Sequence, residues 1–208
     1  DPLTGDGAGV LLQIPRAFFA KHGPKKLLKA GDYAVGMVFL PTFPADRERC
    51  EEIFLKIIKE EKQVFLGWRD VPVNAEKCGE LSREVMPFIR QIFIGRGPDT
   101  GTDDAFERKL YVIRKRVETQ VRAEGLKYGD DFYVCSLSHR TIVYKGQLTA
   151  SQIPQYFLDI QDPSLDSAIA MVHQRFSTNT FPSWKRAHPY RYVIHNGEIN
   201  TVRGNSNW

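Results

Sequence analysis

The sequence has 208 residues, enough for one domain or at most two, and enough to bury a hydrophobic core without disulfides or metals. A composition of 42% hydrophobic and 12% aromatic residues excludes disorder as the main state. The net charge of +4, from 29 basic and 25 acidic residues, is too small an excess to indicate a nucleic-acid partner, and no apolar run reaches the length of a membrane span.

The N-terminal half predicts strands interrupted by helices, because apolar runs bounded by proline and glycine alternate with one strongly periodic segment. That segment places Ile53, Phe54, Ile57 and Ile58 on one helical face. In chain order, the predicted elements are the strand Val10–Ile14, one or two helical turns over Arg16–His22, the strand Tyr33–Leu40, a helix from Asp46 to about Lys62, and the strands Gln63–Val73 and Phe88–Ile94.

The C-terminal half predicts a second long helix followed mainly by strands. The predicted elements are a helix from Asp103 or Asp104 to about Val117, then the strands Phe132–Leu137, Thr141–Tyr144, Ala168–Arg175 and Tyr190–His195. Because only residues 138–140 separate the first two of these strands, we expect a hairpin there. About seven strands, mostly adjacent in sequence, and two long helices indicate an α+β fold with antiparallel pairing.

The glycine-rich residues 4–9 resemble a phosphate-binding loop only superficially. They lack the Gly-Lys-Ser/Thr sequence, and a strand follows them where a phosphate loop would begin a helix. We therefore predict a tight turn that needs glycine at a positive φ.

Cys50, Cys78 and Cys135 form an odd set without paired spacing, which suits a reducing compartment and predicts a cytoplasmic protein. A zinc site would have to gather Cys135 and histidines from distant strands, whereas zinc ligands are usually closely spaced in part. We expect three buried, apolar cysteines and no metal site.

Two positions near the C-terminal end could carry chemistry. Arg175 follows an apolar strand, where a guanidinium could bind a carboxylate in bidentate fashion or simply pair with a surface acid. Asn196-Gly197 is a strong hairpin-turn signal, and its side-chain amide and main-chain N–H could also stabilise an oxyanion. The turn and the oxyanion hole are compatible, since a turn can present both donors.

The segments HQRFSTNTFPSW (173–184), AHPYRYVIHNGEINT (187–201) and VRGNSNW (202–208) closely resemble the glutaminase domain of glutamate synthase large subunits. That domain is a class II glutamine amidotransferase of the N-terminal nucleophile hydrolase superfamily. The resemblance covers nearly the whole chain, so residues 1–208 are expected to be a partial domain of this type. It implies a four-layer αββα sandwich, two antiparallel sheets between helical layers, incomplete at both ends.

The resemblance also implies the reaction and its residues. Glutamine is hydrolysed to glutamate and ammonia through a thioester on an N-terminal cysteine, whose α-amino group acts as the base. Arg175 matches the residue that binds the substrate α-carboxylate, and Ser177 and Thr178 lie in the loop that lines the pocket. Asn196 and Gly197 match the oxyanion hole, and His188 matches a histidine near the pocket in some relatives.

The chain opens on Asp1 without an initiator Met and stops at Trp208, so we expect a piece of a larger protein. In the family the nucleophilic cysteine precedes the residues that match Asp1 onward, and the aspartate that holds the substrate amino group follows the NGEINT motif. We therefore expect the fragment itself to be unable to hydrolyse glutamine.

In the parent enzyme implied by the resemblance, ammonia aminates 2-oxoglutarate at a flavin site. FMN and a 3Fe-4S cluster are expected in other domains and none in this segment. The implied partners are L-glutamine, the remaining synthase domains and, in the NADPH-dependent type, a small NADPH-oxidising subunit. The expected location is cytoplasmic, and the ferredoxin-dependent type would also allow a plastid. Two alternatives stay open, the glutaminase domain of another class II amidotransferase and a non-catalytic domain that reuses this fold.

Overall fold

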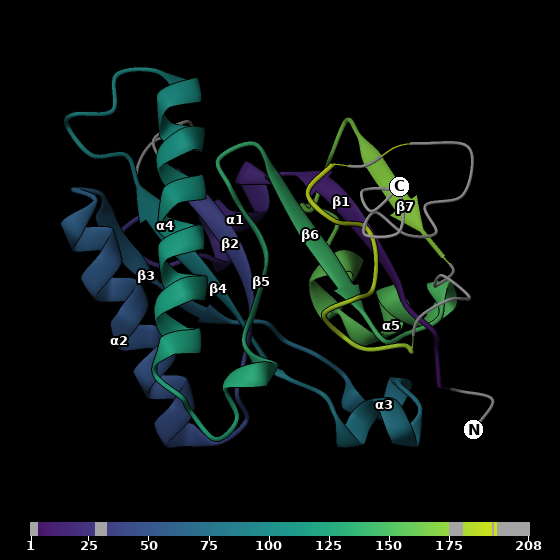
Figure 1. Ribbon diagram of the computed structural model, residues 1–208. Helices are drawn as coiled ribbons and strands as arrows, with labels where there is room; N and C mark the ends of the chain where they lie inside the picture. The colour runs from purple at the N-terminus through teal and green to yellow at the C-terminus, as the bar shows by residue number, and fades with distance from the viewer. Residues whose placement is uncertain (1–3, 28–32, 175–180, 193, 195–208) are drawn as a thin grey trace, which may run out of the picture.

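The computed structural model describes residues 4–27, 33–174, 181–192 and 194, and their strands form two antiparallel sheets (Figure 1). One sheet has the order β6-β1-β7 and the other β3-β4-β2-β5. The strands are β1 (Ala8–Gln13), β2 (Tyr33–Leu40), β3 (Val64–Asp70), β4 (Phe88–Gly95), β5 (Tyr133–Ser138), β6 (Thr141–Gly146) and β7 (Ala170–His173). The α+β class and the antiparallel pairing predicted from the sequence are confirmed.

Helices complete the layers. The α-helices are α1 (Arg16–His22), α2 (Pro44–Glu60), α3 (Glu80–Glu84), α4 (Asp103–Ala123) and α5 (Ile153–Tyr156). Short 3-10 turns are η1 (Ala75–Lys77), η2 (Gly129–Asp131), η3 (Ala150–Gln152) and η4 (Leu158–Gln161). In the described part of the chain, both long helices, α2 and α4, lie against the same face of the four-stranded sheet (Figure 1).

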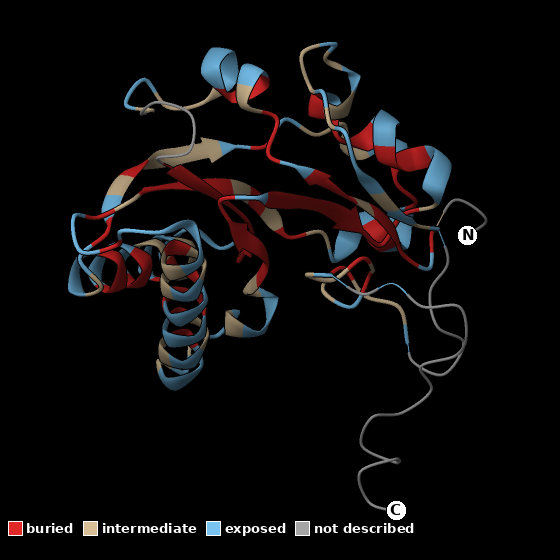
Figure 2. Cartoon of the chain, turned by 90° about the horizontal axis from the view of Figure 1, so that it is seen from above, coloured by how far each residue is buried: buried red, intermediate tan, exposed pale blue. Residues whose placement is uncertain are grey.

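Strand β2 is the centre of the molecule, because all eight of its residues are buried and it pairs with both β4 and β5. Successive side chains of a strand point to opposite faces. The odd-numbered side chains of Tyr33–Phe39 belong to an apolar cluster that also contains residues of β1 and β6, while Ala34, Val38 and Leu40 pack against α2 and α4. The buried strands and the exposed outer sides of α2 and α4 are visible in Figure 2.

The two long helices follow the predicted pattern with one difference at a cap. In α2, the predicted apolar face is buried as expected. Helix α4 begins at Asp103, but its cap is Thr102, whose hydroxyl accepts a hydrogen bond from the Ala105 N–H at 3.2 Å. Asp103 and Asp104 instead lie in the first turn, where negative charge favours the helix dipole, and the helix continues beyond Val117 to Ala123.

The predicted hairpin of two C-terminal strands is wrong, because β5 and β6 belong to different sheets. Residues 138–140 turn the chain from one sheet to the other. The Ser138 hydroxyl accepts the Arg140 N–H at 2.9 Å, and Glu107 of α4 accepts the Ser138 hydroxyl at 2.7 Å and the His139 N–H at 2.8 Å. A distant helix therefore fixes this corner, which local turn signals could not reveal.

Two further strands predicted in the C-terminal part differ from the structure. Strand β7 is shorter than predicted, and the predicted strand Tyr190–His195 is not formed at residues 190–192 and 194. The rest of that segment lies outside the described residues.

A buried polar network connects the two sheets. Arg69 of β3 forms a bidentate ion pair with Asp159 of η4, at 2.7 and 2.8 Å. The Tyr144 hydroxyl of β6 donates to Asp159 at 3.0 Å and accepts from the Gln91 amide of β4 at 3.0 Å, while the Gln91 carbonyl accepts from Arg69 at 2.8 Å. Burial and the neighbouring carboxylate raise the pKa of Tyr144, so it stays a hydroxyl donor.

We predict that Asp159→Ala lowers the free energy of unfolding by about 3–5 kcal/mol, because it leaves a largely buried guanidinium without its carboxylate. Urea unfolding followed by circular dichroism measures the change. Asp99→Ala is the matched control, since it removes an exposed ion pair with Lys62 and is expected to cost less than about 1 kcal/mol. Equal losses in the two variants would contradict the role of the network.

Candidate functional site

The structure describes one of the predicted site residues, His188. Arg175, Ser177, Thr178, Asn196 and Gly197 lie outside the described residues, so their predicted roles stay predictions.

His188 is the middle member of a stack of rings. Its imidazole lies 4.6 Å from that of His173, at the end of β7, and 4.2 Å from the Tyr190 ring. Burial lowers the pKa of His173, and its Nε2 is buried without a hydrogen-bond partner among the described residues. The stack therefore joins the end of β7 to the chain around His188.

Residues 184–191, which we call the connecting segment, lie between the loop that contains Arg175 and the Asn196-Gly197 pair. The two ends of this segment are fixed to α3 and to β5. The Trp184 indole N–H donates to the Ser82 carbonyl at 2.9 Å, and the Arg191 guanidinium donates to the carbonyls of Val134 and Cys135 at 3.0 and 3.3 Å. The segment is thus held by long-range contacts in the absence of any strand pairing of its own.

A buried lysine fixes the middle of the connecting segment. Lys145 of β6 is fully buried, and its ammonium donates to the Lys185 carbonyl at 2.9 Å. The Nζ atom also lies 4.6 Å from the centre of the Tyr133 ring and 4.8 Å from that of Tyr190. Burial lowers the pKa of Lys145 to about 8. The sequence signal for this residue is a lysine that follows the apolar residues Ile142–Tyr144 in a buried strand.

Two glycines let the connecting segment approach the three-stranded sheet. A Cβ on Gly9 would lie 2.7 Å from the His188 carbonyl oxygen, and one on Gly146 would lie 2.4 Å from the Trp184 ring. Neither distance is compatible with a side chain. The glycine at a positive φ predicted within residues 4–9 is Gly7, with φ 137°, but the predicted turn is shorter because Ala8 and Gly9 already belong to β1.

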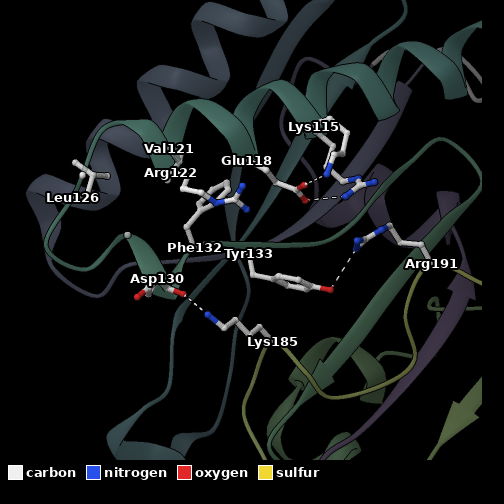
Figure 3. A pocket seen from close by; sticks show the side chains of 13 residues that line it. Lys115, Glu118, Val121, Arg122, Leu126, Asp130, Phe132, Tyr133, Lys185 and Arg191 are labelled. Carbon is white, nitrogen blue, oxygen red and sulfur yellow. Dashed lines mark hydrogen bonds and ion pairs between the residues drawn. The ribbon is translucent and has the colours of Figure 1, made fainter. Parts of the chain in front are cut away.

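A basic cavity of about 570 Å³ lies beside the connecting segment, between α4, η2 and β5 (Figure 3). Its wall includes an ion-paired group in which Glu118 accepts from Arg114 and Lys115. On the opposite side, Lys185 donates to the Asp130 carbonyl at 3.0 Å and Arg191 reaches toward Tyr133. The excess of cations would favour an anionic group there.

The three cysteines are free and buried, as predicted. Burial raises the pKa of Cys50 and of Cys135 to about 12, and it also raises that of Cys78. Because the thiolate is the nucleophilic form, none of the three is activated. Within the described ranges, no group of three or more His, Cys, Asp or Glu could hold a metal ion, and no helix is long and apolar enough to cross a membrane.

Sequence comparison decides the family. Residues 1–208 match the family model described as glutamine amidotransferases class-II. The chain belongs to the class II glutamine amidotransferases. The resemblance found in the sequence is therefore confirmed, and the amidotransferase assignment applies along the whole chain.

This chain is similar to glutamate synthases that are several times its length. It is 53% identical over its whole length to the NADPH glutamate synthase large chain of Bacillus subtilis and 44% identical to that of Azospirillum brasilense. It is 41% identical over 99% of its length to the ferredoxin-dependent glutamate synthase 1, chloroplastic/mitochondrial, of Arabidopsis thaliana. The chain spans 13–14% of the length of these relatives.

We predict that the three thiols of the native amidotransferase chain react with Ellman's reagent at pH 8 more than about tenfold slower than in urea, because raised pKa values leave little thiolate. The absorbance of the released thionitrobenzoate measures the rate, which should increase as pH rises. A thiol that reacts in the native chain as fast as in urea would contradict this.

Proposed function

We propose that this domain is the glutaminase part of a glutamate synthase large chain. It hydrolyses L-glutamine to glutamate and ammonia, and the longer chain uses the ammonia to aminate 2-oxoglutarate. The observation that carries the proposal is similarity along the whole chain to glutamate synthases of two electron-donor types, at 53% identity for an NADPH enzyme and 41% for a ferredoxin-dependent one.

The proposed chemistry needs a nucleophile, a substrate anchor and an oxyanion hole. A cysteine that precedes Asp1 in the longer chain attacks the amide carbon, with its own α-amino group as the base. Asn196 and Gly197 stabilise the resulting oxyanion, ammonia leaves with the transferred proton, and water hydrolyses the thioester to glutamate. Arg175 binds the substrate carboxylate, while Ser177 and Thr178 line the pocket.

The proposed role of His188 is indirect. Its ring is stacked between His173 and Tyr190, which favours a part in shaping the pocket wall over proton transfer. No histidine base is needed where the α-amine of the nucleophile serves that purpose.

The proposed cofactors and partners belong to the longer chain. FMN and a 3Fe-4S cluster are assigned to its other domains, and a small NADPH-oxidising subunit would serve the NADPH-dependent type. A cytoplasmic location is proposed, and the ferredoxin-dependent type would also allow a plastid, since its plant relatives are named as chloroplastic whereas that of Synechocystis is not. Purifying the longer chain and identifying its electron donor separates the two.

We predict that the isolated 208-residue chain releases no ammonia from glutamine above the uncatalysed rate, because its three cysteines are buried, internal and not activated. A coupled glutamate dehydrogenase assay measures the ammonia. Activity from the isolated chain would refute the proposed N-terminal cysteine.

In the longer chain, we predict that Asn196→Ala lowers kcat of glutamine hydrolysis roughly 10²- to 10³-fold, since it removes one oxyanion donor. Synthesis of glutamate from added ammonium salt should be unaffected, because that route bypasses the glutaminase. The matched control is Asn74→Ala, which removes only the cap of η1. Equal kcat in the Asn196→Ala variant and the wild type would sink the assignment and favour a non-catalytic domain.

A further inference from the structure

Lys145 is the most unusual charged residue in the described part of the chain. Its side chain is fully buried, yet no carboxylate contacts it there. Its ammonium donates to the Lys185 carbonyl at 2.9 Å and, more weakly, to the Tyr133 hydroxyl at 3.5 Å, and it lies over the Tyr133 and Tyr190 rings. An ammonium without a carboxylate in the core is costly, so stability alone does not account for a lysine at this position.

The contacts of Lys145 show which part of the chain its ammonium group fixes. Its Nζ atom fixes the carbonyl of Lys185, one residue after Trp184 packs on Gly146. Its Cβ lies beside Gly9, the same position that the His188 carbonyl approaches. The side chain therefore fills the space between β6, β1, β5 and the connecting segment, and its charged end is directed to the backbone of that segment.

We propose that Lys145 is a positioning residue for glutamine hydrolysis, which holds the connecting segment, the part of the chain that joins the Arg175 loop to the Asn196-Gly197 pair in the sequence. This inference rests on the proposed function. Lys185 lies about midway between Arg175 and Asn196 in the sequence, so on this proposal a shift of its backbone lowers the rate of glutamine hydrolysis. A displacement near 1 Å can cost about 10²-fold in rate.

The surroundings of Lys145 predict a pH dependence. The groups that face it are Tyr133 and Cys135 of β5 and Tyr190 and Arg191 of the connecting segment. Burial raises the pKa of both tyrosines and of Cys135, so none of them loses a proton near neutral pH. His173, behind His188, has a lowered pKa and titrates on the acid side. Lys145, with a pKa of about 8, is thus the facing group that changes charge between neutral and mildly basic pH.

The direction of the pH effect on kcat/KM follows from the charge of the Lys145 amine. Below pH 8 the ammonium is charged and attracts the Lys185 carbonyl, and above it the neutral amine is a weaker donor. Glutamine-dependent kcat/KM should therefore rise as the proposed N-terminal amine loses its proton and fall again as Lys145 does. The same loss of charge relieves a desolvation cost in the folded state, so folding stability should rise, not fall, over that pH range.

The experiment compares three variants of the longer chain. Lys145→Met removes the charge while keeping the approximate volume, and Lys145→Arg keeps a cation that does not titrate. The control is Lys62→Met, which removes a 73% exposed lysine that pairs with Asp99. The measurements are kcat/KM for glutamine from pH 6 to pH 10, glutamate synthesis from ammonium salt, and circular dichroism.

We expect Lys145→Met to lower glutamine-dependent kcat/KM roughly 10- to 100-fold with unchanged ammonium-dependent synthesis. The falling limb of the wild-type pH profile should be absent in Lys145→Met and shifted beyond pH 10 in Lys145→Arg. Wild-type kcat/KM and the wild-type falling limb in Lys145→Met would overturn the inference. If Lys145→Met fails to fold, an unshifted falling limb in Lys145→Arg, or no such limb in the wild type, overturns it instead. A wild-type chain without any glutaminase activity would refute the proposed function.

Discussion

A buried polar network around the Arg69–Asp159 ion pair links the two sheets. Gln91 of β4 and Tyr144 of β6 belong to this network, so it contacts at least one strand of each of the two sheets. Since β1 pairs with β6, and β7 with β1, the whole three-stranded sheet is placed by this network. The connecting segment, which contains His188, then packs on that sheet through Gly9 and Gly146.

The fold and the proposed chemistry meet at β6. Tyr144 takes part in the network between the sheets, and the next residue, Lys145, contacts the connecting segment. Adjacent residues of a strand point to opposite faces, so β6 can contact the other sheet through one residue and the connecting segment through the next. The contacts that join the sheets and those that hold the connecting segment therefore come from the same six residues, Thr141–Gly146.

The sequence alone was sufficient to predict those elements whose local pattern agrees with their burial in the structure. Strand β2 and the buried face of α2 follow from apolar runs and helical spacing, and the family follows from long motifs in the C-terminal part. It failed at the corner after β5, because Glu107 of α4 fixes that turn from 31 positions away. It also missed Lys145, since the carbonyl and rings that stabilise its charge come from segments far along the chain. The roles of Arg175 and Asn196 rest on family motifs alone.

The contact of Gly9 with the connecting segment has a genetic consequence. At this position the obstacle to a side chain is formed by the main-chain oxygens of Tyr144 and His188 and by the Cβ of Lys145. A loss-of-function substitution at Gly9 therefore could not be suppressed by shortening any one neighbouring side chain, since two of the three clashing atoms are backbone. Second-site revertants should be rare there, whereas at Gly146, where the Trp184 ring is the obstacle, a smaller residue at position 184 could restore the fit.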